Sequence, residues 1–309
     1  MYQIMNKNLI ISTSINPPTE AIRKFDKLKN WTLIVVGDKK TPKNYKLKNG
    51  VYLSPKDQEQ IDKKLSDIIG WNCIERRNLG LVYAKKSNAK IIALVDDDNI
   101  PYKEWGKNIL IGNTIKAKFY KTSEPVFDPI YQTNYKSLWH RGFPVDRLDK
   151  REDLKYTLKE VKVDVQADFW NGDPDIDAIA RIMLKPKCKF NNNHFPFYSN
   201  KISPFNSQNT FLDAKLLKNY FLFPDQGRMH DIWASYYLQY VRKINVVYSK
   251  PSVFQDRNLH DLSVDLKNEL IGLKYSSAII NKMSQKQFKL NDFFSKKSIE
   301  AYKLYLKHF

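Results

Sequence analysis

A short apolar segment, Ile91–Val95, runs directly into three carboxylates, Asp96, Asp97 and Asp98. An apolar run of this length predicts a buried strand, and its carboxyl end lies at the sheet edge where open α/β sheets bind ligands. Adjacent carboxylates repel one another unless a hard divalent cation such as Mg²⁺ or Mn²⁺ holds them. The alternative is a solvated acidic turn, and the apolar segment before the carboxylates favours the cation site.

Strands and helices alternate along the first third of the chain. Strands are expected over 8–12, 31–36, 51–53 and 90–95, and helices from 16–20 onward, over 54–70 and over 75–88. This alternation predicts an α/β fold with a mostly parallel sheet and helices on both faces. A glycine-rich dinucleotide motif and a P-loop are absent from the sequence. Beyond Tyr102 the pattern becomes mixed, and from Asp261 it is mainly helical. We therefore expect one α/β domain over 1–260 and a helical carboxyl-terminal appendage over 261–309.

The composition narrows the class of protein. No apolar run approaches the roughly 18 residues that a membrane span needs, and Met1–Asn8 does not resemble a secretory leader. The two cysteines, Cys73 and Cys188, lie far apart. This argues against a zinc site and a disulfide framework, and it fits a reducing, cytoplasmic location.

The formal net charge is +19. It is compatible with nucleic-acid binding, with an anionic membrane surface, or with a generally lysine-rich protein, and its even spread favours the last. Near the carboxyl end, lysines alternate with aromatic residues. A helix from Ser298 would carry an apolar stripe of Ile299, Tyr302, Leu306 and Phe309. We expect this stripe to pack on the domain; contact with an anionic membrane is the alternative.

Four further positions carry side chains suited to binding or catalysis. Asp38 ends the strand over 31–36 and could accept hydrogen bonds from a base or ribose, or could begin a turn. Arg77 could bind a diphosphate through its planar guanidinium, or could lie on an exposed helix face. Asp231 could be a general base or a helix cap. The polar run over 206–210 could bind sugar hydroxyls or form an ordinary loop.

These segments occur in the same order in a known family. The chain resembles the plant STELLO glycosyltransferases and their bacterial relatives over roughly residues 8 to 260. It more remotely resembles the reversibly glycosylated polypeptides, which are UDP-arabinopyranose mutases. The matching segments are 13–16, 18–21, 35–42, 52–55, 77–80, 96–101, 175–178, 205–210 and 230–233.

The resemblance implies a GT-A-like fold with a nucleotide-binding half over 1–101 and an acceptor half over 102–260. It implies that Asp96 and Asp98 hold Mn²⁺ or Mg²⁺ and that Asp231 is the catalytic base. It also implies a set of residues that bind the nucleotide sugar: Thr13, Asp38, Arg77, Asp96, Asp97 and Asn209. Many enzymes of this fold carry a late histidine as a further metal ligand. Here Gln255 stands at the matching place, with His260 beyond it, so the third protein ligand is left open.

The resemblance therefore predicts a metal-dependent, inverting glycosyltransferase of surface polysaccharide biosynthesis. The expected donor is a nucleotide sugar, with a UDP-sugar favoured, and the expected acceptor is a glycan or a lipid-linked precursor. We expect a cytoplasmic enzyme with peripheral contact to an anionic inner membrane face. A sugar-nucleotide mutase is the alternative enzyme. A basic nucleic-acid-binding protein is supported by net charge alone, and no nucleic-acid partner is expected.

Overall fold

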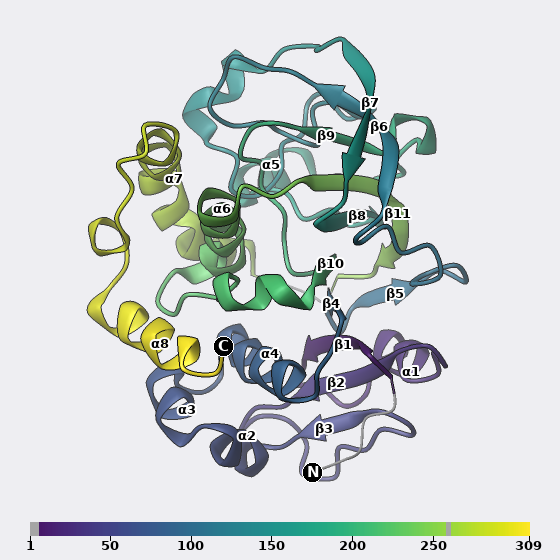
Figure 1. Cartoon of the computed structure of the whole chain (residues 1–309), viewed down its shortest axis with the longest axis vertical. Coiled ribbons are helices and arrows are strands. Elements are labelled where there is room, and N and C mark those ends of the chain that lie inside the picture. The colour runs from purple at the N-terminus through teal and green to yellow at the C-terminus, as the bar shows by residue number, and fades with distance from the viewer. Residues whose placement is uncertain (1–5, 258–260) are drawn as a thin grey trace.

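The computed structural model describes residues 6–257 and 261–309, and its described strands form one continuous sheet (Figure 1). Ten described strands follow the order β3-β2-β1-β4-β10-β8-β11-β9-β6-β7, and the eleventh, β5, pairs with β11 off this path. The strands are β1 Asn8–Thr13, β2 Thr32–Val36, β3 Val51–Leu53, β4 Ile91–Val95, β5 Asn99–Pro101, β6 Thr114–Tyr120, β7 Tyr156–Lys162, β8 Val165–Gly172, β9 Phe197–Ser199, β10 Asn209–Asp213 and β11 Val246–Gln255. The α-helices are α1 Glu20–Phe25, α2 Pro55–Ile61, α3 Lys63–Ile69, α4 Arg77–Lys86, α5 Ala178–Leu184, α6 His230–Arg242, α7 Leu262–Ser284 and α8 Lys296–Leu306.

The first four strands are parallel. Strand β1 pairs with β2 and with β4, and β2 pairs with β3. Their central residues are apolar and buried, as expected for strands covered on both faces. Because the crossovers from β1 to β2 and from β3 to β4 run in opposite directions across the sheet, right-handed connections put α1 and α4 on opposite faces (Figure 1). The carboxyl ends of β1, β2 and β4 therefore meet at one edge.

The second half of the sheet is mixed. Strand β10 runs antiparallel to both β4 and β8 and joins the two halves. Strands β8 and β11 are parallel neighbours, and β6 and β7 form an antiparallel pair at the far edge. The predicted α/β fold with a helical carboxyl-terminal region is confirmed, with the continuous parallel pairing concentrated in β1–β4.

Strand β11 is longer than the sequence suggests. The pattern predicts a strand over 245–248, and Pro251 argues against its continuation because proline cannot donate to a ladder. The structure continues the strand to Gln255 through a register shift between Ser249 and Val253. The irregularity accommodates the proline, and the extended strand carries Gln255 to the same sheet edge as the β4 carboxylates.

The single helix predicted over 54–70 is two helices. Asp62 has extended backbone angles, and its carboxylate accepts a hydrogen bond from the Leu65 amide at 2.9 Å, so it ends α2 and caps α3. Ser54 caps α2, so the first turn of each of the two helices has a side-chain cap.

Helix α8 packs against the fold as predicted: Tyr302 of the predicted stripe is buried, and Ile299, Leu306 and Phe309 pack against the core as partly buried residues. The centre of the packed face is shifted from the stripe. The buried residues of the helix are Ser298, Ala301, Tyr302 and Tyr305, whereas Ile299 and Leu306 are half-buried. The Tyr305 hydroxyl donates to the Leu217 carbonyl at 2.8 Å, and this buried hydrogen bond sets the rotation of the helix. Within the described ranges, no helix combines the length and the apolar character needed to span a bilayer.

Candidate functional site

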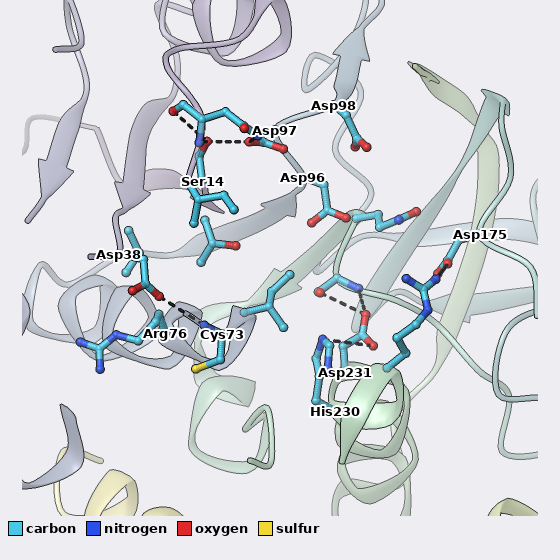
Figure 2. A pocket seen from close by; sticks show the side chains of 18 of the residues that line it. Ser14, Asp38, Cys73, Arg76, Asp96, Asp97, Asp98, Asp175, His230 and Asp231 are labelled. Carbon is cyan, nitrogen blue, oxygen red and sulfur yellow. Dashed lines mark hydrogen bonds and ion pairs between the residues drawn. The ribbon is translucent and has the colours of Figure 1, made fainter. Parts of the chain in front are cut away.

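A cavity of about 560 Å³ opens where β1, β2 and β4 end (Figure 2). Most of the residues predicted for the site line it: Thr13, Asp38, Asp96, Asp97, Asp98 and Asp231. The sheet topology explains why residues so far apart in sequence meet, because parallel strands direct their carboxyl ends to one edge.

Asp97 fastens the acidic turn to the end of β1. Its carboxylate accepts hydrogen bonds from the Ser14 hydroxyl at 2.5 Å and from the Asn16 amide at 3.1 Å. Figure 2 shows Asp97 directed toward Ser14. Burial raises the pKa of Asp97, and the two hydrogen bonds oppose that rise. The Asp97 carboxylate is therefore engaged by hydrogen bonds within the protein. Its sequence neighbours Asp96 and Asp98 also line the cavity.

Arg77 positions Asp96 from behind. Its guanidinium lies 2.7 Å from the Asp96 carboxylate and also donates to the carbonyls of Val95 and Ser207. The Arg77 side chain is fully buried and does not line the cavity. The direct contact with a diphosphate that the resemblance suggests is therefore absent from the geometry. Arg77 instead neutralises and orients one carboxylate of the cavity.

Asn209 also lies outside the lining. Its amide donates to the Phe169 carbonyl at 3.0 Å and to the Ser252 hydroxyl at 2.9 Å, so it joins β10 to β8 and β11 as part of the core. Two neighbours in the same polar run, Ser207 and Gln208, line the cavity instead. The polar run over 206–210 therefore contributes Ser207 and Gln208 to the cavity lining, whereas the predicted Asn209 lies in the core beside it.

Asp98 lies beside Gln255. The Gln255 amide nitrogen is 3.3 Å from the Asp98 carboxylate, and the Asp256 amide donates to the Asp98 carbonyl at 3.1 Å. The position follows from the antiparallel pairing of β5 and β11, which sets Gln255 opposite Asn99. Gly172 permits the close approach from β8, since a Cβ there would lie 2.4 Å from the Gln255 carbonyl.

Oxygen atoms of the kinds that bind hard cations line this edge of the cavity. No three side chains of the His, Cys, Asp and Glu types converge on one point among the residues that the structure describes. The cavity instead combines Asp96 and Asp98 with two buried amide oxygens, those of Gln208 and Gln255, which have no hydrogen-bond partner within the described chain. Carboxylate and amide oxygens are the ligands that Mg²⁺ and Mn²⁺ prefer. His260 falls outside the described residues.

Asp38 occupies another side of the cavity. Its carboxylate accepts backbone hydrogen bonds from Lys39 at 2.6 Å and from Asn72 at 2.7 Å. Figure 2 shows Asp38 and Cys73 on one side of Asp96, with Asp175 and Asp231 on the other. The carboxylate centre formed by Asp96, Asp97 and Asp98 thus lies between two walls of the cavity. One wall contains Asp38, and the other contains Asp175 and Asp231.

The wall around Asp231 is a buried network of arginines and carboxylates. Arg141 lies 2.8 Å from Asp175 and 2.9 Å from Asp231. Arg228 and Arg257 lie within 4 Å of Asp175 as well, at 3.7 and 3.9 Å. Burial opposes ionisation of both aspartates, but Arg141 outweighs it and holds the pKa of each well below its usual range. Sequence reasoning missed these arginines because their partners are remote in the chain.

His230 was also missed, although it adjoins Asp231 at the start of α6. Its Nδ1 lies 2.6 Å from the Gly227 carbonyl, which can only accept, so the neutral ring carries its proton on Nδ1. In that tautomer Nε2 is the acceptor nitrogen, and it lies 3.8 Å from the Asp231 carboxylate. Both side chains line the cavity. This is an arrangement in which a ring nitrogen can accept a proton and a carboxylate can stabilise the resulting cation.

Two curated proteins of Arabidopsis thaliana are similar in sequence. "Probable glycosyltransferase STELLO2" is 25% identical over 220 residues, covering 65% of this chain and 29% of the relative. "Probable glycosyltransferase STELLO1" is 26% identical over 212 residues, covering 62% of this chain and 28% of the relative. The chain thus spans less than a third of the length of either relative. No protein-family model matches it. The chain is thus similar in sequence to the STELLO-type glycosyltransferases, and its α/β sheet with a helical carboxyl-terminal region is consistent with a GT-A-like fold.

Proposed function

We propose that this protein is a metal-dependent glycosyltransferase. It would move a sugar from a nucleotide-sugar donor, with a UDP-sugar favoured, to a glycan or lipid-linked acceptor of surface polysaccharide biosynthesis. The observation that carries this proposal is the cavity at the ends of β1, β2 and β4, where a carboxylate and amide oxygen set lies beside a wall with a candidate proton acceptor. The similarity to two proteins named as glycosyltransferases supports the reaction class.

The proposed metal ligands are Asp96, Asp98 and Gln255. Asp96 and Asp98 are the pair suggested by the sequence, and Gln255 contributes a buried amide oxygen beside Asp98. In the structure the Gln255 nitrogen faces Asp98, so a rotation of the amide would be needed to exchange nitrogen for oxygen. When bound, Mn²⁺ or Mg²⁺ supplies a Lewis acid that offsets negative charge on the diphosphate and on the departing nucleotide.

The nucleotide is proposed to lie between the carboxylate centre and Asp38. Residues 1–101 supply this part of the cavity through Thr13, Asp38 and Asn72, whose side chains and backbone offer hydrogen-bonding groups. Arg77 acts indirectly, since it fixes one oxygen of Asp96 and lowers the repulsion between Asp96 and its neighbours. These groups orient the donor and pre-organise the charged end of the site.

The acceptor is proposed to approach along the wall formed by residues 102–260. Arg141 favours the ionised form of Asp231, and His230, which lines the cavity, offers Nε2 as an acceptor in its neutral tautomer. We assign proton removal from the acceptor hydroxyl to this pair, with His230 receiving the proton and Asp231 stabilising the imidazolium. Attack on the side of the anomeric carbon opposite the nucleotide would invert its configuration, and inversion rests on the resemblance to other enzymes of the fold.

A thermal-shift screen of nucleoside diphosphates and nucleotide sugars tests the proposal. Each compound is measured with Mn²⁺, with Mg²⁺ and with EDTA. We expect at least one nucleotide to stabilise the protein, and to do so much more strongly with metal, because a bound ligand raises the free energy of unfolding with its concentration relative to Kd. Mass spectrometry with the stabilising sugar nucleotide and a glycan acceptor then detects transfer. Ring isomerisation of the sugar without transfer would instead establish a mutase.

A further inference from the structure

The carboxyl-terminal end of α5 is an exposed apolar tip. Ile182, Met183 and Leu184 are consecutive and are 38%, 72% and 46% exposed. The helix buries its other side through Ala178, Ala180 and Arg181, so the tip is not needed to attach α5 to the fold. Isolated exposed apolar residues are ordinary, whereas these three consecutive ones concentrate exposed apolar side chains at the end of one helix.

The surroundings of this tip are strongly basic. Lys185, Lys187 and Lys189 follow it directly, and all three are exposed. No acidic residue occurs between Asp177 and Asp213 in the sequence. Asp173 pairs with Arg181 at the buried side of α5, whereas the segment that follows the tip carries lysines and no carboxylate of its own. An apolar tip followed by exposed lysines is complementary to an anionic bilayer, whose interior accepts the apolar side chains and whose headgroups attract the lysines.

The tip is joined to the wall of the candidate site. Backbone hydrogen bonds between Gly172 and Cys188, at 2.8 and 2.7 Å, tie the segment after the tip to the end of β8. The residues between them include Asp175, which lines the cavity. The amino end of α5 is held by Glu269 of α7, which accepts from the Ala178 amide at 2.7 Å. The tip and the cavity wall therefore belong to one rigidly connected segment.

We propose that Ile182, Met183 and Leu184, with the lysines that follow, form the surface on which this protein binds anionic membranes. The tip enters the interface between headgroups and acyl chains, and the lysines contact the headgroups. The consequence for catalysis, that a lipid-linked acceptor would be presented near the cavity, rests on the proposed function. Helix α8 is not this surface, because Tyr302 and Tyr305 are buried in the fold.

Sedimentation with vesicles tests the surface. The full chain is mixed with vesicles of phosphatidylcholine alone or with added phosphatidylserine. We expect binding to the anionic vesicles only, weakening as salt is raised. Met183→Glu should abolish most of it. Lys185→Gln with Lys187→Gln should weaken it about fivefold for each lysine, the equivalent of about 1 kcal/mol near a charged surface.

Two matched variants serve as controls. Leu158→Glu changes an apolar residue that is 57% exposed on β7, and Lys296→Gln with Lys303→Gln removes two exposed lysines of α8. Both should bind anionic vesicles as the wild type does. The proposal is overturned if the wild type does not bind anionic vesicles, or if Met183→Glu binds as tightly as Leu158→Glu.

The thermal-shift measurement with nucleotide and Mn²⁺ is run on every variant. Met183→Glu should keep the wild-type thermal-shift response. That result would show that the variant is folded and that it has lost only its binding to anionic vesicles. If the wild type binds vesicles but gives no nucleotide response, the proposed function fails while the membrane surface stands. If the wild type gives the nucleotide response but does not bind vesicles, the membrane surface fails while the proposed function stands.

Discussion

Replacing Arg77 by methionine removes the charge that holds Asp96 while keeping most of the side-chain volume. In the structure the Arg77 guanidinium donates to Asp96 at 2.7 Å, to the Ser207 carbonyl at 2.6 Å and to the Val95 carbonyl at 3.2 Å. Arg77→Met leaves these acceptors without their donor. It therefore perturbs both the stability of the fold and the geometry of the carboxylate centre.

The size of the effect follows from burial. Removing one partner of a buried ion pair costs about 3–5 kcal/mol. The Asp96 side chain is 21% exposed, so water compensates part of the loss, and we expect about 2–4 kcal/mol. At about 2.1 cal/mol/K for each residue, a chain of 309 residues has an unfolding entropy of about 0.65 kcal/mol/K. The melting temperature should fall by roughly 3–6 °C.

Arg151→Met is the matched control. The Arg151 side chain is 11% exposed, and it pairs with Asp128 at 3.0 Å and with the Leu138 carbonyl at 2.7 Å, away from the lining of the cavity. Both variants should lose stability in calorimetry. Only Arg77→Met should also lose the extra stabilisation that a nucleotide gains from Mn²⁺. The reasoning is refuted if Arg77→Met melts within about 1 °C of the wild type, or if it keeps the full metal-dependent response.

Three further perturbations test other parts of the structure. His230→Gln and Asp231→Asn should each slow sugar transfer about 10²–10⁴-fold with nucleotide binding retained, and near-wild-type transfer in either variant would remove that residue from proton removal. Tyr305→Ala should lower the free energy of unfolding by about 3–5 kcal/mol in urea melts, whereas Lys303→Ala should change it by less than about 0.5 kcal/mol; equal losses would contradict the packing of α8. Burial raises the pKa of Asp168 to about 7, so the folded state retains a proton that the unfolded chain releases near pH 4, and the wild type should lose stability as the pH rises between about 4 and 7. Between pH 5 and pH 8 this loss amounts to about 3 kcal/mol. Asp168→Asn should lack it in melts at these two pH values, and identical pH dependence in both proteins would contradict the assignment.

The strands of the first half were predictable because each is a continuous apolar run with a polar or glycine boundary. The strand expected over 90–95 is β4 at Ile91–Val95, and Asp96 follows it directly. The break between α2 and α3 was not predictable from periodicity, because it depends on the Asp62 side chain capping a helix in the middle of an apolar pattern. The apolar periodicity correctly indicates helix on both sides of Asp62. The cap at Asp62 divides this stretch into two helices.

The acidic half of the site was predictable, whereas the arginine wall was not. The acidic cluster is visible in the sequence because Asp96, Asp97 and Asp98 are consecutive. Arg141 meets Asp175 and Asp231 across separations of 34 and 90 residues, so no local motif marks it. Arg77 was correctly placed near the carboxylates, but its full burial, and hence its supporting role, depends on packing that the sequence does not display.

Electron paramagnetic resonance of Mn²⁺ tests the proposed metal-bridged nucleotide site most directly, because free Mn²⁺ gives a signal that bound Mn²⁺ loses. The wild type is titrated with Mn²⁺ in the absence and presence of the stabilising nucleoside diphosphate, with the binding of Mn²⁺ by the nucleotide alone subtracted. If the cation bridges Asp96, Asp98 and the nucleotide, each ligand should tighten binding of the other by the same factor, since coupling between two sites is reciprocal. Asp98→Asn should remove that coupling. Equal Mn²⁺ affinity with and without nucleotide in the wild type, or unchanged coupling in Asp98→Asn, would contradict the proposed site.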